Sequence, residues 1–160
     1  MKINIFVLDR NPEVAAKYHC DKHMKMIVES AQMLSTAHWQ SGSQAPYKES
    51  HLNHPCSKWA RESLSNYRWL QKLGMALCHE YTKRYWKIHA TQEKLEWLGE
   101  NEPDIADIGL TDFAQAMPEQ YRDSDAVEAY RKYYLGDKSR FAKWKMGNMP
   151  SWYRENINGI

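Results

Sequence analysis

The segment KYHCDKHMKM, residues 17–26, holds the densest group of side chains that could carry out chemistry. His19 and His23 are four residues apart, the spacing at which one face of a helix presents two imidazoles to a metal ion. Zinc needs further ligands, and the remaining histidines and cysteines do not follow the spacing of a zinc finger or an H-E-x-x-H helix. We therefore predict no metal and no cofactor, while solvated or core-satisfied histidines remain the alternative.

Asp21 lies between these histidines and one helical turn before Lys25. On a solvated helix face the carboxylate would pair with Lys25 and contribute roughly 0.2–0.5 kcal/mol. In a pocket, burial would tune its affinity for protons and make it a candidate general acid or base. His19 and His23 would then be placed to carry protons.

Two other segments combine features that suit nucleic acid. In HLNHPCSKWARES, Asn53 and His54 precede a helix expected to begin at Pro55, with Lys58 and Arg61 nearby. Helix amino termini with bases beside them attract phosphate, and the alternative is a structural helix with its tryptophan in the core.

The carboxyl-terminal segment, residues 133–154, alternates aromatic rings with bases. Such alternation supplies rings for base stacking and charges for phosphates, and it also fits a segment that docks on the core. The residues that we expect to contact nucleic acid here are Lys138, Arg140, Lys143, Trp144, Lys145 and Trp152, together with Lys22 of the first segment.

Helical periodicity must position these groups. INIFVL, residues 3–8, suits a short strand or an extended arm, and apolar residues then recur at spacings of three and four. We predict an all-α fold, a single compact domain over residues 1–160 with four to five helices and a short extended amino-terminal arm. The expected helices cover residues 12–38, 55–85, 91–98 and 124–136.

Composition narrows the class of protein. The 160 residues are 42% hydrophobic and 26% charged, and no apolar run approaches the ~20 residues that span a bilayer. The opening is charged too early for a signal peptide, and three widely spaced cysteines suggest reduced thiols. A cytoplasmic protein without a membrane partner is therefore expected, in the host cell if a phage encodes it.

Charge is segregated along the chain. Residues 1–92 carry a balance of +6, residues 93–128 of −9 and residues 129–160 of +5, for a net charge of +2. This segregation favours a basic face for DNA or a nucleotide, unless the segments fold together and neutralise one another.

The chain resembles the phage and bacterial pyrimidine-dimer DNA glycosylases, the endonuclease V family, in four pieces that occur in the same order. KINI matches the family's opening R-I-N-L, and HCDK stands where its Y/H-R-E-L motif is expected. HPCSKWARESLSNYRWL resembles its H-P-x-x-x-x-W helix with a following tyrosine and W-L pair, and MPSWY resembles P-x-W-Y. Cys20 replaces the motif arginine, and Asp21 replaces the longer glutamate.

The resemblance implies a helical domain that bends DNA, flips a nucleotide and uses its amino-terminal amine as nucleophile. It assigns the nucleophile to Met1 and the assisting carboxylate to Asp21. Cleavage of a glycosidic bond builds positive charge on the sugar, which a carboxylate stabilises. We predict a DNA glycosylase/lyase acting on a damaged or modified base or nucleotide; the alternatives are a binding module without chemistry and, third, a metal-dependent hydrolase.

Overall fold

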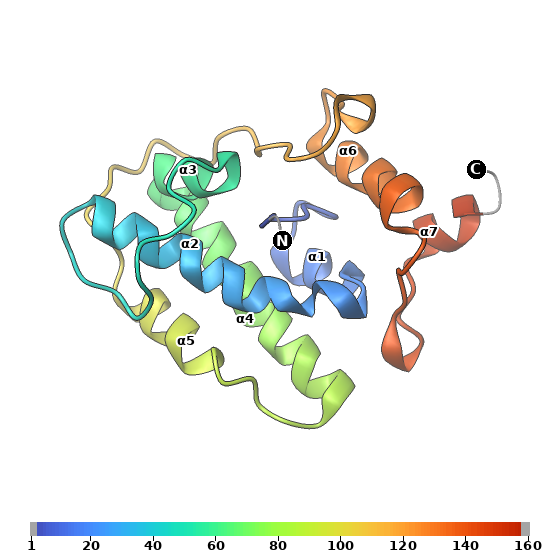
Figure 1. The fold of residues 1–160 in the computed structure, drawn as a ribbon, viewed down its shortest axis with the longest axis horizontal. Coiled ribbons are helices and arrows are strands. Elements are labelled where there is room, and N and C mark those ends of the chain that lie inside the picture. Colours follow the sequence, from blue (N-terminus) through green and yellow to red (C-terminus); the bar gives the residue numbers. More distant parts are fainter. Residues whose placement is uncertain (1–2, 158–160) are drawn as a thin grey trace.

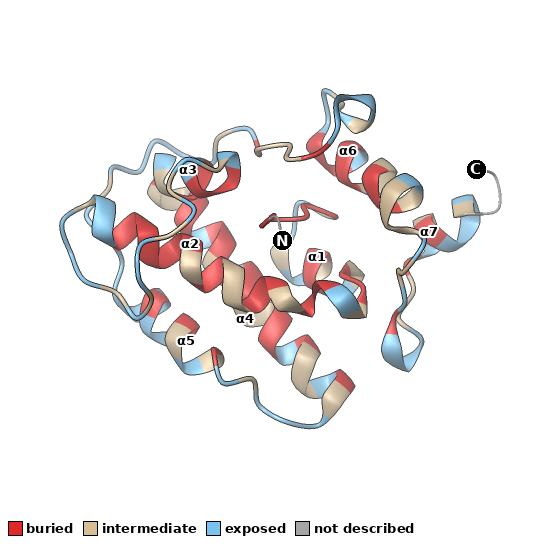
Figure 2. Ribbon diagram, viewed as in Figure 1, coloured by how far each residue is buried: buried red, intermediate tan, exposed pale blue. Residues whose placement is uncertain are grey.

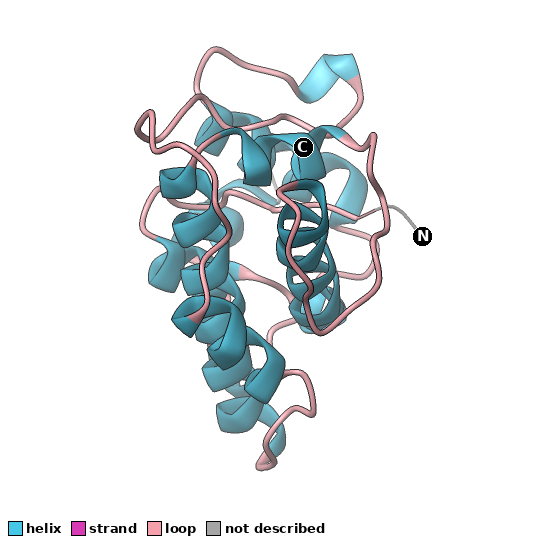
Figure 3. Cartoon of the chain, turned by 90° about the vertical axis from the view of Figure 1, so that its left-hand side faces the viewer, coloured by secondary structure: helices cyan, strands magenta, loops and turns pink. Residues whose placement is uncertain are grey.

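The structure is a computed structural model that describes residues 3–157, and every regular element within that range is helical (Figure 3). The all-helical prediction is confirmed. The expected number of helices is corrected upward, because two predicted helices are broken and one more follows near the carboxyl terminus (Figure 1). The seven α-helices are α1 (Pro12–Tyr18), α2 (Met26–Gln40), α3 (Pro55–Glu62), α4 (Leu64–Tyr85), α5 (Gln92–Glu100), α6 (Ala126–Tyr133) and α7 (Ser151–Asn156).

Helix α4 is the longest element and packs against α1, α2, α3 and α5. Leu70, Leu73 and Leu77 lie at the predicted helical spacing, and all three are fully buried. A Cβ atom on Gly74 would lie 2.8 Å from Cδ2 of Leu95, so the glycine allows α5 to approach closely. None of the helices in the described range is long and apolar enough to cross a membrane.

Residues 3–8 form an extended arm that runs through the interior, with its apolar side chains buried (Figure 2). Later parts of the chain hold this arm by its polar groups. Asn4 Nδ2 donates to the Ala116 carbonyl at 2.8 Å, and Arg131 Nε donates to the Leu8 carbonyl at 3.0 Å. The beginning of the chain is therefore enclosed by its second half.

The helix predicted over residues 12–38 is broken at His19 and Cys20, which are both extended. The buried Arg84 of α4 donates to the carbonyls of Lys17 at 3.1 Å and His19 at 2.8 Å. These carbonyls are bonded to the guanidinium instead of to later helical amides, so α1 ends at Tyr18. A short 3₁₀ turn, η1 (Asp21–Lys25), then leads into α2.

The second predicted helix, over residues 55–85, is interrupted at Ser63, which is also extended. The loop after α5 binds this point: Leu64 N donates to the Ala106 carbonyl, and Ile108 N donates to Ser63 Oγ, both at 3.1 Å. The break thus anchors the long 101–125 connection to the junction of α3 and α4.

Candidate active site

A pocket of about 800 Å³ opens beside the amino-terminal arm. Its wall is drawn from separate parts of the chain: the arm, η1 with the start of α2, the start of α3, the loop before α6 and the turn after α6. This volume falls in the range of ~300–1,000 Å³ that is usual for ligand pockets. The charged lining residues are Lys22, Lys25, Arg122, Asp137, Lys138 and Arg140, and the aromatic ones are Phe6, His23, His54, Tyr133 and Phe141.

Bases outnumber acids strongly in this lining, so the pocket attracts anions. Several of these bases gather on one ring: Lys22 Nζ lies 4.6 Å and Lys138 Nζ 5.8 Å from the centre of the Phe141 ring. Arg140 lies 5.4 Å from the same ring. The charges come from two distant segments, η1 and the turn after α6, and they meet at Phe141.

Phe6 forms an aromatic wall of the pocket. Its backbone φ of 33° is unfavourable for a bulky residue, and its buried neighbours in the arm hold it in place. The Phe6 ring stacks on His23, with the ring centres 4.0 Å apart and the planes inclined by 14°. The strained backbone therefore presents a ring at the functional surface.

The two predicted histidines are both buried, and their hydrogen bonds lead to different partners. His19 Nδ1 donates to the Ala15 carbonyl at 2.7 Å, while its Nε2 is buried with no hydrogen-bond partner among the described residues. His23 Nδ1 shares a hydrogen bond of 2.5 Å with the Tyr134 hydroxyl. No cluster of three or more potential metal ligands occurs within residues 3–157.

Burial keeps both imidazoles neutral near pH 7. It lowers the pKa of His19 to about 4, with a further lowering from the nearby Arg84 charge. Burial also lowers the pKa of His23 to about 2, helped by the neighbouring His19 and Lys138. Both rings therefore stay unprotonated near pH 7.

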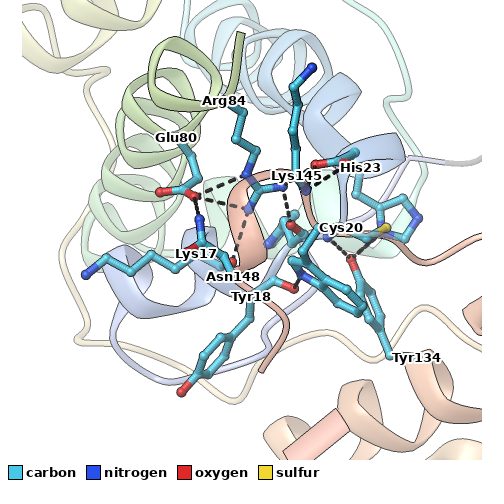
Figure 4. A network of polar contacts seen from close by, with 12 residues as sticks. Lys17, Tyr18, Cys20, His23, Glu80, Arg84, Tyr134, Lys145 and Asn148 are labelled. Carbon is cyan, nitrogen blue, oxygen red and sulfur yellow. Dashed lines mark hydrogen bonds and ion pairs between the residues drawn. The ribbon is translucent and has the colours of Figure 1, made fainter. Parts of the chain in front are cut away.

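Asp21 is bound on two sides by Arg84 and Lys145, which come from other parts of the chain. Figure 4 shows these two partners close to each other. Arg84 Nη1 donates to Oδ1 at 2.9 Å, and Lys145 N lies 3.0 Å from both carboxylate oxygens. Asp21 N in turn donates to the Lys143 carbonyl at 2.7 Å. Its ion pair is thus with Arg84 rather than with Lys25, and Asp21 fastens the carboxyl-terminal segment to η1.

Glu29 is a carboxylate that the sequence motifs did not single out. It lies one helical turn beyond Lys25 and Met26, which both line the pocket, so it shares their face of the helix. Its Oε2 is buried without a hydrogen-bond partner among the described residues, and burial raises the pKa of the carboxyl. In the sequence, the helical spacing of residues 22, 25 and 29 is the pattern that could have identified Glu29 as a candidate.

The structure brings together only some of the predicted site residues. Lys22, His23, His54, Lys138 and Arg140 line the pocket. Met1 lies outside the described residues, and His19 and Asp21, described above, do not line the pocket. The remaining predicted residues also lie elsewhere. They are Asn53 and Lys58, exposed near the start of α3; Arg61, which donates to the Leu52 carbonyl; Trp144, buried with its Nε1 donating to the Tyr18 carbonyl; Trp152, half-buried beneath Arg131; and Lys143 and Lys145, exposed beside Asp21.

The start of α3, considered above both as a phosphate seat and as a structural helix start, is capped by His54. His54 Nδ1 accepts from Cys56 N at 3.1 Å and so caps the helix with its own side chain. Sequence reasoning also missed Arg122 and the pocket role of Lys25. Arg122 lies in the acidic 93–128 segment, where local composition gives no sign of a basic pocket.

Comparison with known families agrees with the order of the motifs. Residues 3–94, more than half of the chain, match the sequence model of the family described as pyrimidine dimer DNA glycosylase. This region contains the arm, η1 and helices α1 to α4, and the MPSWY motif lies beyond it. No curated protein and no solved structure matches the chain. The family resemblance is confirmed, and the chain belongs to the pyrimidine dimer DNA glycosylase family.

Proposed function

We propose that the protein is a DNA glycosylase/lyase that takes a damaged or modified nucleotide into the basic, aromatic pocket beside its amino-terminal arm. One observation carries this proposal. The bases of η1 and of the turn after α6 meet around aromatic rings in a pocket that Ile3, two residues after Met1, also lines. Phosphates suit the bases, and an unstacked base suits the rings.

The α-amine of Met1 is the proposed nucleophile. With a reference pKa of about 7.7–8.0, this amine is partly neutral at pH 7 and can attack C1′ of the target nucleotide. The glycosidic bond breaks, its electron pair leaves with the base, and the base takes up a proton. The attacking nitrogen loses a proton, and the C1′–O4′ bond then breaks, so that O4′ leaves with its electron pair and takes up a proton while the nitrogen lone pair forms the imine to C1′. Loss of a C2′ proton then expels the 3′ phosphate.

We assign the assisting carboxylate to Glu29 and a positioning role to Asp21. Both Asp21 oxygens already accept hydrogen bonds from protein groups, whereas Glu29 keeps a buried unpartnered oxygen on the helix face that lines the pocket. A carboxyl with a raised pKa can receive the proton that the attacking amine releases. Before it takes up that proton, the carboxylate anion can stabilise the charge that develops on the sugar.

His19 and His23 are assigned to packing rather than to proton transfer. Both imidazoles are neutral near pH 7. The His23 ring stacks on Phe6 and is hydrogen-bonded to the Tyr134 hydroxyl. In this proposal His23 fixes the aromatic wall on which the nucleotide rests.

Borohydride trapping on duplex DNA with an abasic site tests the proposal. A covalent adduct that maps to the amino-terminal peptide is expected, because an imine between Met1 and the sugar is reduced in place. An adduct on Lys25 would overturn the assignment of the nucleophile, since this pocket lysine also has a pKa lowered by burial. DNA binding with neither adduct nor base release would instead support a module that binds the nucleotide without chemistry.

That second function has one observation in its favour. The residue at the motif position, Asp21, is engaged in an ion pair and in a backbone hydrogen bond. If Glu29 does not supply a carboxylate, the pocket retains its bases and rings for binding alone.

A further inference from the structure

Three large apolar side chains project into solvent at the end of α4 and in the nearby 143–148 segment. Trp86 is 83% exposed, Ile88 72% and Met146 57%. The two segments lie side by side, because Asn148 Nδ2 donates to Glu80 at 3.3 Å and Lys145 Nζ lies 5.1 Å from the Tyr85 ring centre (Figure 1). We call this surface, formed by residues 83–88 and 143–146, the α4 tip.

The backbone holds these side chains outward. Trp86 follows α4 with a φ of 62°, and Met146 has a φ of 70°, both in the left-handed region that bulky residues rarely adopt. The fully buried Arg84 lies directly beneath, paired with Glu80 at 3.1 Å and with Asp21 at 2.9 Å (Figure 4). The exposed side chains are therefore supported by a constrained backbone above the buried Arg84.

The charge around the α4 tip has one sign. Lys83, Lys87, Lys143 and Lys145 are all exposed, and neither residues 81–89 nor residues 139–150 contain an acid. The acids that approach the tip from below, Glu80 and Asp21, are paired with Arg84. An exposed apolar cluster rimmed by lysines suits a DNA duplex, because the duplex carries anionic phosphates on the outside and stacked apolar bases inside.

The α4 tip is joined to the pocket by a short basic segment. Lys138 and Arg140 line the pocket, and Lys143 and Lys145 flank the tip. Eight extended residues span at most about 26–29 Å, and one base pair rises about 3.4 Å. The tip consequently lies within about eight base pairs of a nucleotide held in the pocket.

We propose that the α4 tip is a second DNA contact, with Trp86 and Ile88 wedged against a base step and the surrounding lysines on phosphates. This inference rests on the proposed DNA substrate and adds to it a surface outside the pocket. Apolar wedges of this kind partly unstack a step and bend the duplex, and aromatic side chains add stacking contacts with the bases.

The test uses the full-length chain with Trp86→Ala and the double variant Trp86→Ala/Ile88→Ala. The matched control is Ile108→Ala, which removes an equally exposed side chain (66%) from the acidic segment. The probes are a fluorescent 30-base-pair duplex with a central abasic site and a three-nucleotide abasic oligomer that cannot reach the tip. Thermal melting and a Trp86→Phe variant, which keeps an aromatic ring, check that the tip is folded.

We expect the double variant to bind the duplex at least about tenfold more weakly and to bend it less by energy transfer between labelled ends. Trp86→Phe should recover most of the affinity, and the control should match the unchanged protein. The loss should be much smaller for the three-nucleotide oligomer.

Unchanged duplex affinity in the folded double variant would overturn the inference, as would an equal loss on the three-nucleotide oligomer. A change of oligomeric state without a change in DNA affinity would also overturn it, and would assign the tip to a second copy of the chain. If the unchanged protein binds duplex but forms no borohydride adduct, the proposed chemistry fails while the tip remains supported by its own variants.

Discussion

Arg84 and Asp21 form an ion pair of 2.9 Å between two helical segments that are 63 residues apart in the chain. The guanidinium is fully buried, and it also caps the carbonyls that end α1. One arginine therefore ends α1, orients η1 and, through Asp21, holds the carboxyl-terminal segment in place.

Replacing Asp21 by Asn should destabilise the fold. The amide keeps one acceptor but leaves the buried Arg84 with only one of its two charge partners, Glu80, at a cost of about 1–3 kcal/mol. Chemical denaturation measures the change. Asp9→Asn is the matched control, because its pair with Arg131 is longer at 3.4 Å and is partly solvated, so it should cost under about 1 kcal/mol. Equal effects of the two variants would contradict the positioning role.

Replacing Glu29 by Gln should lower activity without destabilising the fold. The carboxyl that accepts the released proton is lost, so turnover should fall about 100-fold or more while the protein stays folded. Base release from a duplex under single-turnover conditions measures this, with the exposed Glu13→Gln as control. Full activity in Glu29→Gln beside an inactive but folded Asp21→Asn would return the catalytic role to Asp21.

Acid should weaken the fold through its buried histidines. The pKa of His19 is about 4 in the folded state against a reference value near 6.5, so the unfolded chain binds more protons between these values. His23, with a pKa of about 2, acts in the same direction. The free energy of unfolding should be constant above pH 7 and fall by roughly 2–4 kcal/mol between pH 7 and pH 5.

Denaturant titrations at several pH values, with variants at single histidines, check this slope. His19→Gln should flatten the pH dependence, whereas His79→Gln on the exposed surface of α4 should not. Glu29 has a raised pKa and contributes with the opposite sign, so the comparison between variants isolates the histidines. A pH-independent stability from pH 7 to pH 5 would show that His19 and His23 are protonated in the folded state.

The bases of the pocket should set the salt dependence of DNA binding. Each lost phosphate contact lowers the slope of log K against log salt by about 0.9, so Lys138→Gln/Arg140→Gln should lower it by up to about 1.8. Lys58→Gln is a discriminating control, because Lys58 was predicted as a contact from its helix start but does not line the pocket. A larger effect from Lys58 would move the DNA to the face formed by α3.

The periodic spacing of apolar residues predicted the helices well because it reflects which side chains are buried. The same spacing of buried side chains continues across the breaks between helices. Cys20, Met24 and Ile27 keep the predicted spacing and are all buried, although a 3₁₀ turn separates α1 from α2. The break itself depends on Arg84, a residue far along the chain whose hydrogen bonds leave no local pattern. The sequence therefore indicated which residues are buried and where α1 begins, but it could not place the end of α1 at Tyr18.

The residues of the candidate site could be predicted where they lie together in one sequence segment. The η1 lysine Lys22 and the turn residues Lys138 and Arg140 were found from their segments, and they do line the pocket. Arg122 and the arm residue Phe6 were missed, because they reach the pocket only through tertiary packing. Trp144, expected to meet DNA, instead donates its indole N–H to the Tyr18 carbonyl inside the protein.

The enclosed arm has a consequence for the order of events during synthesis. Asn4 bonds to Ala116 and Leu8 to Arg131, sequence separations of 112 and 123 residues. Contacts this distant require closure of a very long loop and form slowly compared with helices. The arm is thus among the last segments to reach its native contacts, and a nascent chain has no complete pocket until Phe141 has left the ribosome.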